Sequence, residues 1–313
     1  MNNKVTILVN SCDKYEDAWE PFFRLLKIQW PECENYKIVL STESKQYNCD
    51  FLDVKTINIE ENMSWSARLK NALEQIDTKY VLFFLEDFFL LEKVRDDIFN
   101  KALELMERDS EIGLITFNKR RFGSQFPEEV DHDRCFYKVK KSVANRTNVL
   151  VGLWRKEYYL KLIFGDENPW EYEKNSNIRS RYAGWKIYSQ DYKYSPAAFR
   201  YCMNPVDGYG ITYGKWLNKN KELFEAHGIY NVDYDNLGVF EETVTYEDFS
   251  EKKAENKANI KNAAFKDENL KVRLKESVYI LYKIFKKTGF IKKISHCKIC
   301  FKYFIYYKLN YKK

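Results

Sequence analysis

The sequence predicts an α/β domain built on a parallel, doubly wound sheet, and three observations predict it. Residues 80–85 (YVLFFL) are wholly apolar and β-prone, which is typical of a central strand covered on both faces. Strand-like segments alternate with segments of helical periodicity over most of the chain. With 313 residues, of which 45% are hydrophobic and 17% aromatic, the chain can bury the core that such a domain needs.

The individual elements follow from short apolar runs separated by helical patterns. Pro31 ends the first helix, Ser64 is a good N-cap for the second, and Pro169 occupies a tolerated first-turn position in another. The expected strands cover residues 5–10, 37–40, 54–59, 80–85, 112–117 and 149–154, with one or two more within 182–194. The expected helices cover residues 16–29, 65–76, 96–108, 156–164 and 219–226, and one more begins at Asn168.

The remaining segments predict loops and a carboxy-terminal extension. Residues 119–130 are polar and punctuated by glycine and proline, so we expect a loop over the sheet edge. Residues 250–276 are rich in Lys, Glu, Asn and Ala and predict a solvated helical linker. The predicted organisation is a folded domain over residues 1–235 and a helical, basic-aromatic extension over residues 236–313.

Charge and cysteine content narrow the class of protein. The net charge is +6, but residues 277–313 hold ten lysines and no acid, which leaves −4 for the first 276 residues. A mildly acidic body with a cationic end argues against nucleic acid as the partner and suggests an anionic surface. Seven scattered cysteines favour a reducing cytoplasm, and we expect neither a signal peptide nor a membrane span.

Several familiar sites are missing from the sequence. There is no glycine-rich phosphate loop of the P-loop type and no Gly-x-Gly-x-x-Gly after the first strand. The three histidines, at 132, 227 and 296, lack metal-ligand spacing. Cys297 and Cys300 have no second pair, so we interpret them as ordinary thiols.

The strongest candidate site is the pair Glu86–Asp87, which directly follows the buried strand at residues 80–85. Ligands of open α/β sheets bind at the carboxyl ends of strands, and two carboxylates there need a cation or hydrogen-bond donors. A divalent metal is commonly held by one or two carboxylates plus substrate phosphates. The simpler alternative is a strand that exits into solvent and caps the next helix.

Three segments in this order carry a resemblance to a known family: Ser11–Tyr15 after the first strand, WSARL at residues 65–69 and LEDFF at residues 85–89. They resemble nucleotide-sugar glycosyltransferases of the A-type fold, more narrowly the family-2-like enzymes of bacterial capsule and surface-polysaccharide synthesis. The resemblance covers about residues 1–235. It implies a nucleotide-diphosphate sugar donor, a Mn²⁺ or Mg²⁺ ion, and a glycan or lipid-linked acceptor.

The resemblance also implies roles for residues on the donor side. Asp87 would be the metal ligand, with Glu86 binding metal, water or ribose, although the family's motif is Asp-x-Asp. Ser11, Asp13 and Tyr15 would line the nucleobase pocket, but Asp13 alternatively only caps the following helix. Arg68 is a further candidate, which would either reach a phosphate or pair with a glutamate. Lys215 is another, and it lies in a segment with several glycines (208–216) that would either close over the diphosphate or form a plain turn.

On the acceptor side, the family places a general base near the start of a helix. Glu171 is the first candidate because it adjoins Trp170, whose ring suits a sugar face; Glu173 is the second and Asp166 the reserve. A carboxylate in a first helical turn is also favoured by the helix dipole alone. Inversion of configuration is implied by the resemblance only.

The carboxy-terminal segment predicts a peripheral attachment to the inner face of an anionic membrane through residues 271–313. Apolar residues recur there at helical spacing among the lysines: Leu274, Val278, Leu281 and Phe285. The alternative is a helix packed on the body or on another subunit in a homo-oligomer.

Two other functions remain open at this point. A nucleotidyltransferase also uses a doubly wound sheet and carboxylate-held metal, but it usually has a glycine-rich loop where residues 11–15 have no glycine. A non-catalytic protein that binds a membrane surface or nucleic acid through its tail is the second alternative.

Overall fold

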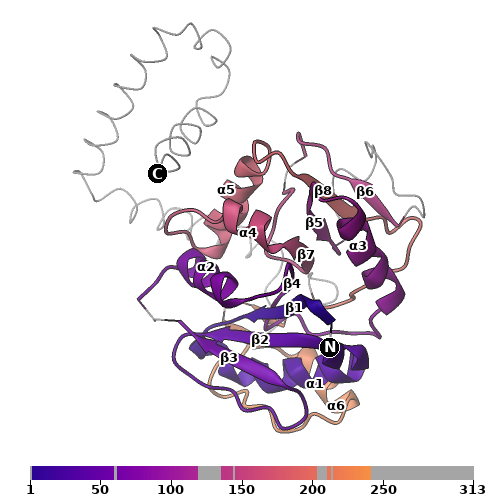
Figure 1. Cartoon of the computed structure of the whole chain (residues 1–313). Helices are drawn as coiled ribbons and strands as arrows, with labels where there is room; N and C mark the ends of the chain where they lie inside the picture. The colour runs from indigo at the N-terminus through magenta and orange to yellow at the C-terminus, as the bar shows by residue number, and fades with distance from the viewer. Residues whose placement is uncertain are drawn as a thin grey trace, which may run out of the picture. The chain divides into compact units, whose positions relative to one another are not determined.

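One eight-stranded sheet organises the described part of the computed structural model, with helices on both faces (Figure 1). The structure describes residues 2–59, 62–118, 135–143, 145–202, 210–212 and 214–240. The strand order is β3-β2-β1-β4-β7-β5-β8-β6. The strands are β1 (Asn2–Asn10), β2 (Tyr36–Thr42), β3 (Val54–Asn58), β4 (Tyr80–Leu85), β5 (Ile112–Thr116), β6 (Phe136–Lys138), β7 (Gly152–Arg155) and β8 (Lys186–Gln190).

Strand β4 lies inside the sheet, between β1 and β7, as its apolar sequence predicts. Alternate side chains point to opposite faces. Leu82 and Phe84 join the core under α1 and α3, whereas Val81 and Phe83 join the core under α2, α4 and α5. The helices are α1 (Trp19–Gln29), α2 (Trp65–Gln75), α3 (Asp96–Arg108), α4 (Lys156–Leu162) and α5 (Pro169–Arg179), with short 3₁₀ helices η1 (Asp13–Ala18) and η2 (Pro31–Asn35).

The predicted α/β fold class is confirmed, but the sheet is mixed rather than parallel. Strand β7 runs antiparallel to both β4 and β5, and β6 runs antiparallel to β8. An apolar run that is buried on both faces has the same composition in either direction, so the sequence did not reveal the reversal. Strand β6, with three residues, was not predicted.

Strand β7 also begins three residues later than the sequence predicts, at Gly152 instead of residue 149. The backbone before it leaves the ladder and bonds to side chains: the N–H of Leu150 donates to Asn148 Oδ1, and the N–H of Val151 donates to the Tyr201 hydroxyl. This segment therefore becomes a loop at the end of the sheet.

The second helix begins where the sequence predicts. The Ser64 hydroxyl accepts a hydrogen bond from the N–H of Ala67 at 3.2 Å, and this satisfies one of the free donors of the first turn. Helix α5 begins with a capping box, in which Asn168 accepts from the N–H of Glu171 and the Glu171 carboxylate accepts from the N–H of Asn168. Both helix starts lie close together, because Ser66 Oγ accepts from the N–H of Glu167.

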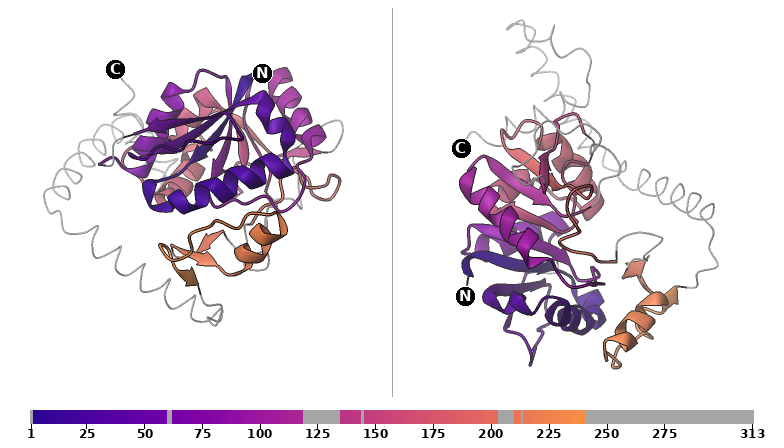
Figure 2. Two further views of the ribbon diagram at one scale, coloured as in Figure 1. Left: turned by 90° about the horizontal axis from the view of Figure 1, so that it is seen from below. Right: turned by 90° about the vertical axis from the view of Figure 1, so that its right-hand side faces the viewer.

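A small three-stranded sheet with one helix follows the main sheet and lies beside α1, in orange in Figure 2. It consists of β9 (Ile211–Thr212), β10 (Lys215–Leu217), α6 (Lys219–Ala226) and β11 (Val239–Phe240). A hydrogen bond of 2.8 Å between Gln29 and His227 joins α6 to the end of α1. Phe89 stacks on Trp216 and meets Phe224 edge-on, so this small sheet packs on the residues that follow Glu86–Asp87.

Residues 1–241 form one compact unit, and residues 242–313 form a second unit that lies outside the described residues. The segments for which the sequence predicts a loop (119–130) and a basic extension (271–313) also lie outside the described residues, as do His132, His296, Cys297 and Cys300. No helix in the described ranges is both long and apolar enough to cross a membrane.

Candidate functional site

The candidate site lies where β1 and β4 end side by side. These parallel strands pair in a register that sets Asn10 against Leu85, so Ser11 comes next to Glu86. Strand β2 lies on one side of β1 and β4 on the other, which makes this pair of strands a switch point in the chain order. Ligands of open α/β sheets bind in the crevice at such a point, beyond the carboxyl ends of the strands.

Glu86, which is buried, and Asp87, which is partly buried, form an acidic pair at this edge. Glu86 is 7% exposed, and burial followed by the charge of Asp87 raises the pKa of its carboxyl well above the usual range. Burial raises the pKa of Asp87 to about 6. Neither carboxylate forms an ion pair with any side chain that the structure describes. A cation would relieve both the repulsion and the desolvation.

The loop after β1 supplies hydrogen-bonding groups to the pair. The Ser11 hydroxyl accepts from the indole N–H of Trp19 at 2.7 Å and lies close enough to Glu86 to lower the pKa of its carboxyl. Burial, with the charge of Glu86, raises the pKa of Tyr15 to about 12, so its phenol stays protonated and can donate. Ser11 and Tyr15 therefore lie beside the acidic pair; the role that the resemblance implies for them is in a nucleobase pocket.

Two exposed lysines, Lys14 and Lys215, lie at or next to the contact between Tyr15 and Gly214. Lys14 Nζ lies 5.6 Å from the centre of the Tyr15 ring, and a Cβ at Gly214 would come within 3.0 Å of the same Nζ. Lys215 is next in the chain after Gly214 and is exposed. In the described residues neither ammonium group has a carboxylate partner. Two carboxylates with lysines nearby would suit a diphosphate that is bound together with a divalent cation.

The donor set fits a hard divalent cation with few protein ligands. Within the described ranges, no group of three or more His, Cys, Asp or Glu side chains could hold a metal. Two carboxylates with raised pKa values, next to hydroxyl donors, match the type of site in which the substrate's phosphates and water complete the coordination. Asp87 and Glu86 are the residues that would hold such an ion.

Asp13 does not cap the helix that follows it. Its carboxylate accepts from the N–H groups of Glu43, Ser44 and Lys45 and from the Ser44 hydroxyl, at 2.5 to 3.2 Å, and so ties η1 to the loop after β2. Burial raises its pKa, but the bonds from Ser44 and Lys45 outweigh burial and hold the pKa below its usual range. The structure thus gives Asp13 a positioning contact beside the site.

Arg68 lies on α2 and pairs with Glu43, whose other carboxylate oxygen accepts from the N–H of Asp13. The Arg68 side chain is only 15% exposed. Its charge acts on the Cys12 thiol, whose pKa is raised by burial and by Glu86 and lowered by Arg68. Arg68 is therefore near the site and already shares its charge with a glutamate.

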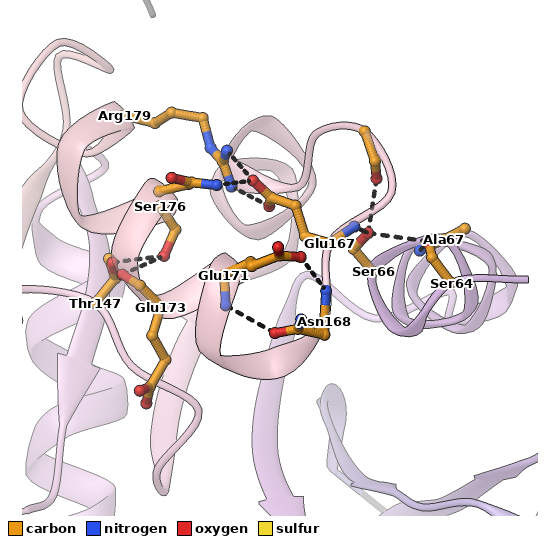
Figure 3. A network of polar contacts seen from close by, with 12 residues as sticks. Ser64, Ser66, Ala67, Thr147, Glu167, Asn168, Glu171, Glu173, Ser176 and Arg179 are labelled. Atoms are coloured by element: carbon orange, nitrogen blue, oxygen red, sulfur yellow. Dashed lines mark hydrogen bonds and ion pairs between the residues drawn. The ribbon is translucent and has the colours of Figure 1, made fainter. Parts of the chain in front are cut away.

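The three acceptor-side candidates have different surroundings (Figure 3). Asp166 accepts from the Ser64 hydroxyl at 3.2 Å, and Glu171 is exposed and turned back onto Asn168 in the capping box. Glu173 points the other way: its Oε1 accepts from the N–H of Val149 at 3.0 Å, and burial raises its pKa.

The position of Val149 places Glu173 along the same sheet edge as the acidic pair. Gly152 pairs with Phe83 in the antiparallel β4–β7 ladder, so the chain before Gly152 runs past the carboxyl end of β4. Val149 is three residues before Gly152, just as Glu86 is three residues after Phe83. Of the three candidates, Glu173 is the one that contacts this loop.

Several residues at this edge were not predicted from the sequence. Lys14 stood in the predicted loop but was not singled out. Gly210 and Asn220 belong to a contact with Asp87 that only the tertiary structure reveals. Asn118, at the end of β5, is buried with an Oδ1 that has no hydrogen-bond partner. Its signal was weak, because a lone asparagine after a strand is common in turns.

No protein-family model matches the sequence, and no curated protein matches it. Solved structures with a similar arrangement include S. aureus TarS 1-349 in complex with UDP, at 14% identity and a TM-score of 0.45, over 65% of this chain and 62% of that one. The mannosyltransferase PcManGT from Pyrobaculum calidifontis in complex with GDP-Man and Mn²⁺ has 12% identity and a TM-score of 0.40, over 59% and 53%. A cytidylyltransferase from Leptospira borgpetersenii has 11% identity and a TM-score of 0.43, over 82% and 95%. Values this low carry no inference about activity, and the chain spans about three fifths of the TarS structure's length.

Proposed function

We propose that this protein is a glycosyltransferase that transfers a sugar from a nucleotide-diphosphate sugar to an acceptor hydroxyl. The observation that carries the proposal is the acidic pair at the β1–β4 switch point, buried Glu86 and partly buried Asp87, without a cationic partner among the described side chains. A pair of this kind is suited to a divalent cation that binds a diphosphate. The resemblance of residues 11–15, 65–69 and 85–89 to A-type glycosyltransferases points to the same chemistry.

On the donor side, the carboxylates would hold the metal ion and the lysines would bind the diphosphate. Asp87, with Glu86, would hold Mn²⁺ or Mg²⁺, which when bound neutralises the diphosphate and makes it a better leaving group. Lys14 and Lys215 would bind the outer phosphate oxygens. Ser11 keeps Glu86 in place, and Tyr15 offers a protonated hydroxyl to the donor.

On the acceptor side, Glu173 is the better-supported general base. The acceptor oxygen would form a bond to the anomeric carbon as the bond to the nucleoside diphosphate breaks, and the hydroxyl proton would pass to a Glu173 oxygen. The contact with Val149 uses Oε1, so Oε2 remains for the proton. The single displacement would invert the configuration.

A donor screen tests the proposal. Purified protein is incubated with UDP-, GDP- and CMP-linked sugars, with and without Mn²⁺, and release of free sugar is measured. We expect Mn²⁺-dependent hydrolysis of one donor class. If no donor is hydrolysed or bound, and a sugar phosphate with a nucleoside triphosphate instead releases pyrophosphate, the protein is a nucleotidyltransferase and the proposal is wrong.

The cellular setting is a separate part of the proposal and rests on the sequence of the carboxy-terminal segment. Ten lysines without an acid, interleaved with aromatic residues, suit the headgroup region of an anionic leaflet. A lipid-linked acceptor in surface-polysaccharide synthesis, handled by a family-2-like enzyme at the inner face of the cell membrane, is consistent with this charge.

Deletion of residues 277–313 is expected to release the protein from membranes. Wild-type protein should sediment with anionic liposomes at low salt and less at high salt, because surface attraction is screened. The deletion variant should stay in the supernatant yet transfer sugar to a water-soluble acceptor at the wild-type rate. Equal sedimentation of both proteins would refute the attachment.

A further inference from the structure

Strand β9 passes directly over Asp87. A Cβ at Gly210 would lie 2.2 Å from the Asp87 carbonyl oxygen and 2.6 Å from Cε2 of Phe89, so only glycine fits there without a shift. The backbone N–H of the next residue, Ile211, lies close enough to the Asp87 carboxylate to lower its pKa. The peptide unit between Gly210 and Ile211 is therefore in close contact with the metal-ligand candidate.

Helix α6 holds this stretch of backbone from the other side. The Asn220 side chain is 2% exposed, and its Nδ2 donates to the carbonyl oxygen of Gly210. The helix itself is fixed on the residues that follow the acidic pair, because Phe224 meets Phe89 with ring centres 4.9 Å apart. Residues 86–89 therefore contact both the backbone at Gly210 and the helix that carries Asn220.

We propose that Asn220 is a positioning residue for Asp87, acting through the Gly210 carbonyl and the Ile211 N–H. An N–H that occupies one carboxylate oxygen fixes the rotation of the group and directs its other lone pairs toward the cation. Hydrogen bonds of this kind to metal ligands typically change metal affinity by 10- to 100-fold. This inference rests on the proposed function, since it assumes that Asp87 binds a divalent metal.

The test is a Mn²⁺ titration of the full-length protein, read by the enhanced relaxation of water protons around protein-bound Mn²⁺. Asn220→Leu removes the donor but keeps a similar volume, and we expect about tenfold weaker Mn²⁺ binding. Asn220→Ala, which also removes the donor, should show the same loss and serves if the leucine variant does not fold. The control Asn100→Leu, on the exposed face of α3, should bind Mn²⁺ as the wild type does.

A second readout separates positioning from a general structural role. In the transfer assay, both Asn220 variants should need about tenfold more Mn²⁺ for half-maximal activity and recover wild-type turnover at saturating Mn²⁺. A structural role alone would lower activity at every Mn²⁺ concentration, and that result would overturn the inference.

The outcomes also distinguish this inference from the proposed function. If the wild type binds Mn²⁺, Asp87→Asn abolishes binding and both Asn220 variants bind normally, only the positioning role is wrong. If the wild type does not bind Mn²⁺ at all, the metal-dependent function is wrong and the positioning role with it.

Discussion

Replacing Asp87 with asparagine is expected to abolish nearly all sugar transfer while the fold stays intact. Asparagine keeps the size of the side chain and an oxygen that accepts from the Ile211 N–H, but it removes the charge that would bind the metal. Removing one neutral group that stabilises a developing charge costs about 10²- to 10³-fold, so loss of a charged metal ligand should cost on the order of 10³-fold or more.

The same substitution should leave the free energy of unfolding unchanged or slightly raise it when no ligand is present. Glu86 and Asp87 repel each other in a poorly solvated site, and asparagine relieves this repulsion. Wild-type protein should melt at a higher temperature when Mn²⁺ and the nucleoside diphosphate are added, since a ligand at 100 times its Kd contributes about 2.7 kcal/mol. The variant should show no such increase.

Asp97→Asn is a matched control for this experiment. Asp97 is an exposed carboxylate at the start of α3, paired with Arg95, and lies outside the candidate site. Its variant should retain transfer and the ligand-induced rise in melting temperature. Asp87→Asn with wild-type turnover would exclude Asp87 as the metal ligand.

Helix and strand positions were predictable wherever local pattern and core burial coincide. Strand β4 and helix α6 have the predicted limits, and α2 begins after the predicted N-cap at Ser64. Strand direction was not predictable, because β7 is buried on both faces and enters the sheet from a loop held by the side chains of Asn148 and Tyr201. The bond to Asn148 is local, but the bond to Tyr201 joins residues 50 positions apart and depends on tertiary structure.

The candidate site was predictable in location but not in its contacts. The acidic pair at the end of a buried strand follows from the rule on strand ends, and the register of β1 and β4 brings Ser11 to it. Asp13, in contrast, bonds to a loop about 30 residues away, and no local pattern encodes that partner. Gly210 and Asp87 are more than 120 residues apart in the chain, so their contact could not be predicted from the sequence either.

The choice between Glu171 and Glu173 depended on a local signal. Asn168 followed three residues later by Glu171 has the spacing of a capping box, which commits the Glu171 carboxylate to the backbone of Asn168. Glu173 is two positions after Glu171 on the same helix, which corresponds to a rotation of about 200° around the helix axis. Glu173 therefore faces away from the capping box. The contacts therefore favour Glu173 as the general base.

Replacing Glu173 with glutamine is expected to lower turnover by roughly 10²-fold or more and to leave donor binding unchanged. Glutamine keeps an oxygen that accepts from the N–H of Val149, so the loop before β7 should stay in place. Glu171→Gln is the matched control two residues away, and it should transfer sugar at nearly the wild-type rate. If Glu171→Gln instead loses turnover and Glu173→Gln does not, Glu171 is the base; if neither does, Asp166 is tested next.

The difference in stability between the wild type and Glu173→Gln should depend on pH with a defined sign. Burial raises the pKa of Glu173 in the folded protein, whereas in the unfolded chain it has its usual value of about 4.3. Below that value the carboxyl is neutral in both states and has no effect on the free energy of unfolding. As the pH rises from the unfolded to the folded pKa, the unfolded state loses its proton first, so wild-type stability falls.

Above the folded pKa, the wild type carries a poorly solvated charge that glutamine does not. Thermal melts of both proteins should therefore nearly coincide at about pH 4, and Glu173→Gln should be the more stable protein at about pH 8. We expect the variant to be more stable and much less active, because the Glu173 charge would serve catalysis while it lowers stability. A variant that is less stable at both pH values would show that the Glu173 carboxylate supports the fold, and the general base would then have to be another residue.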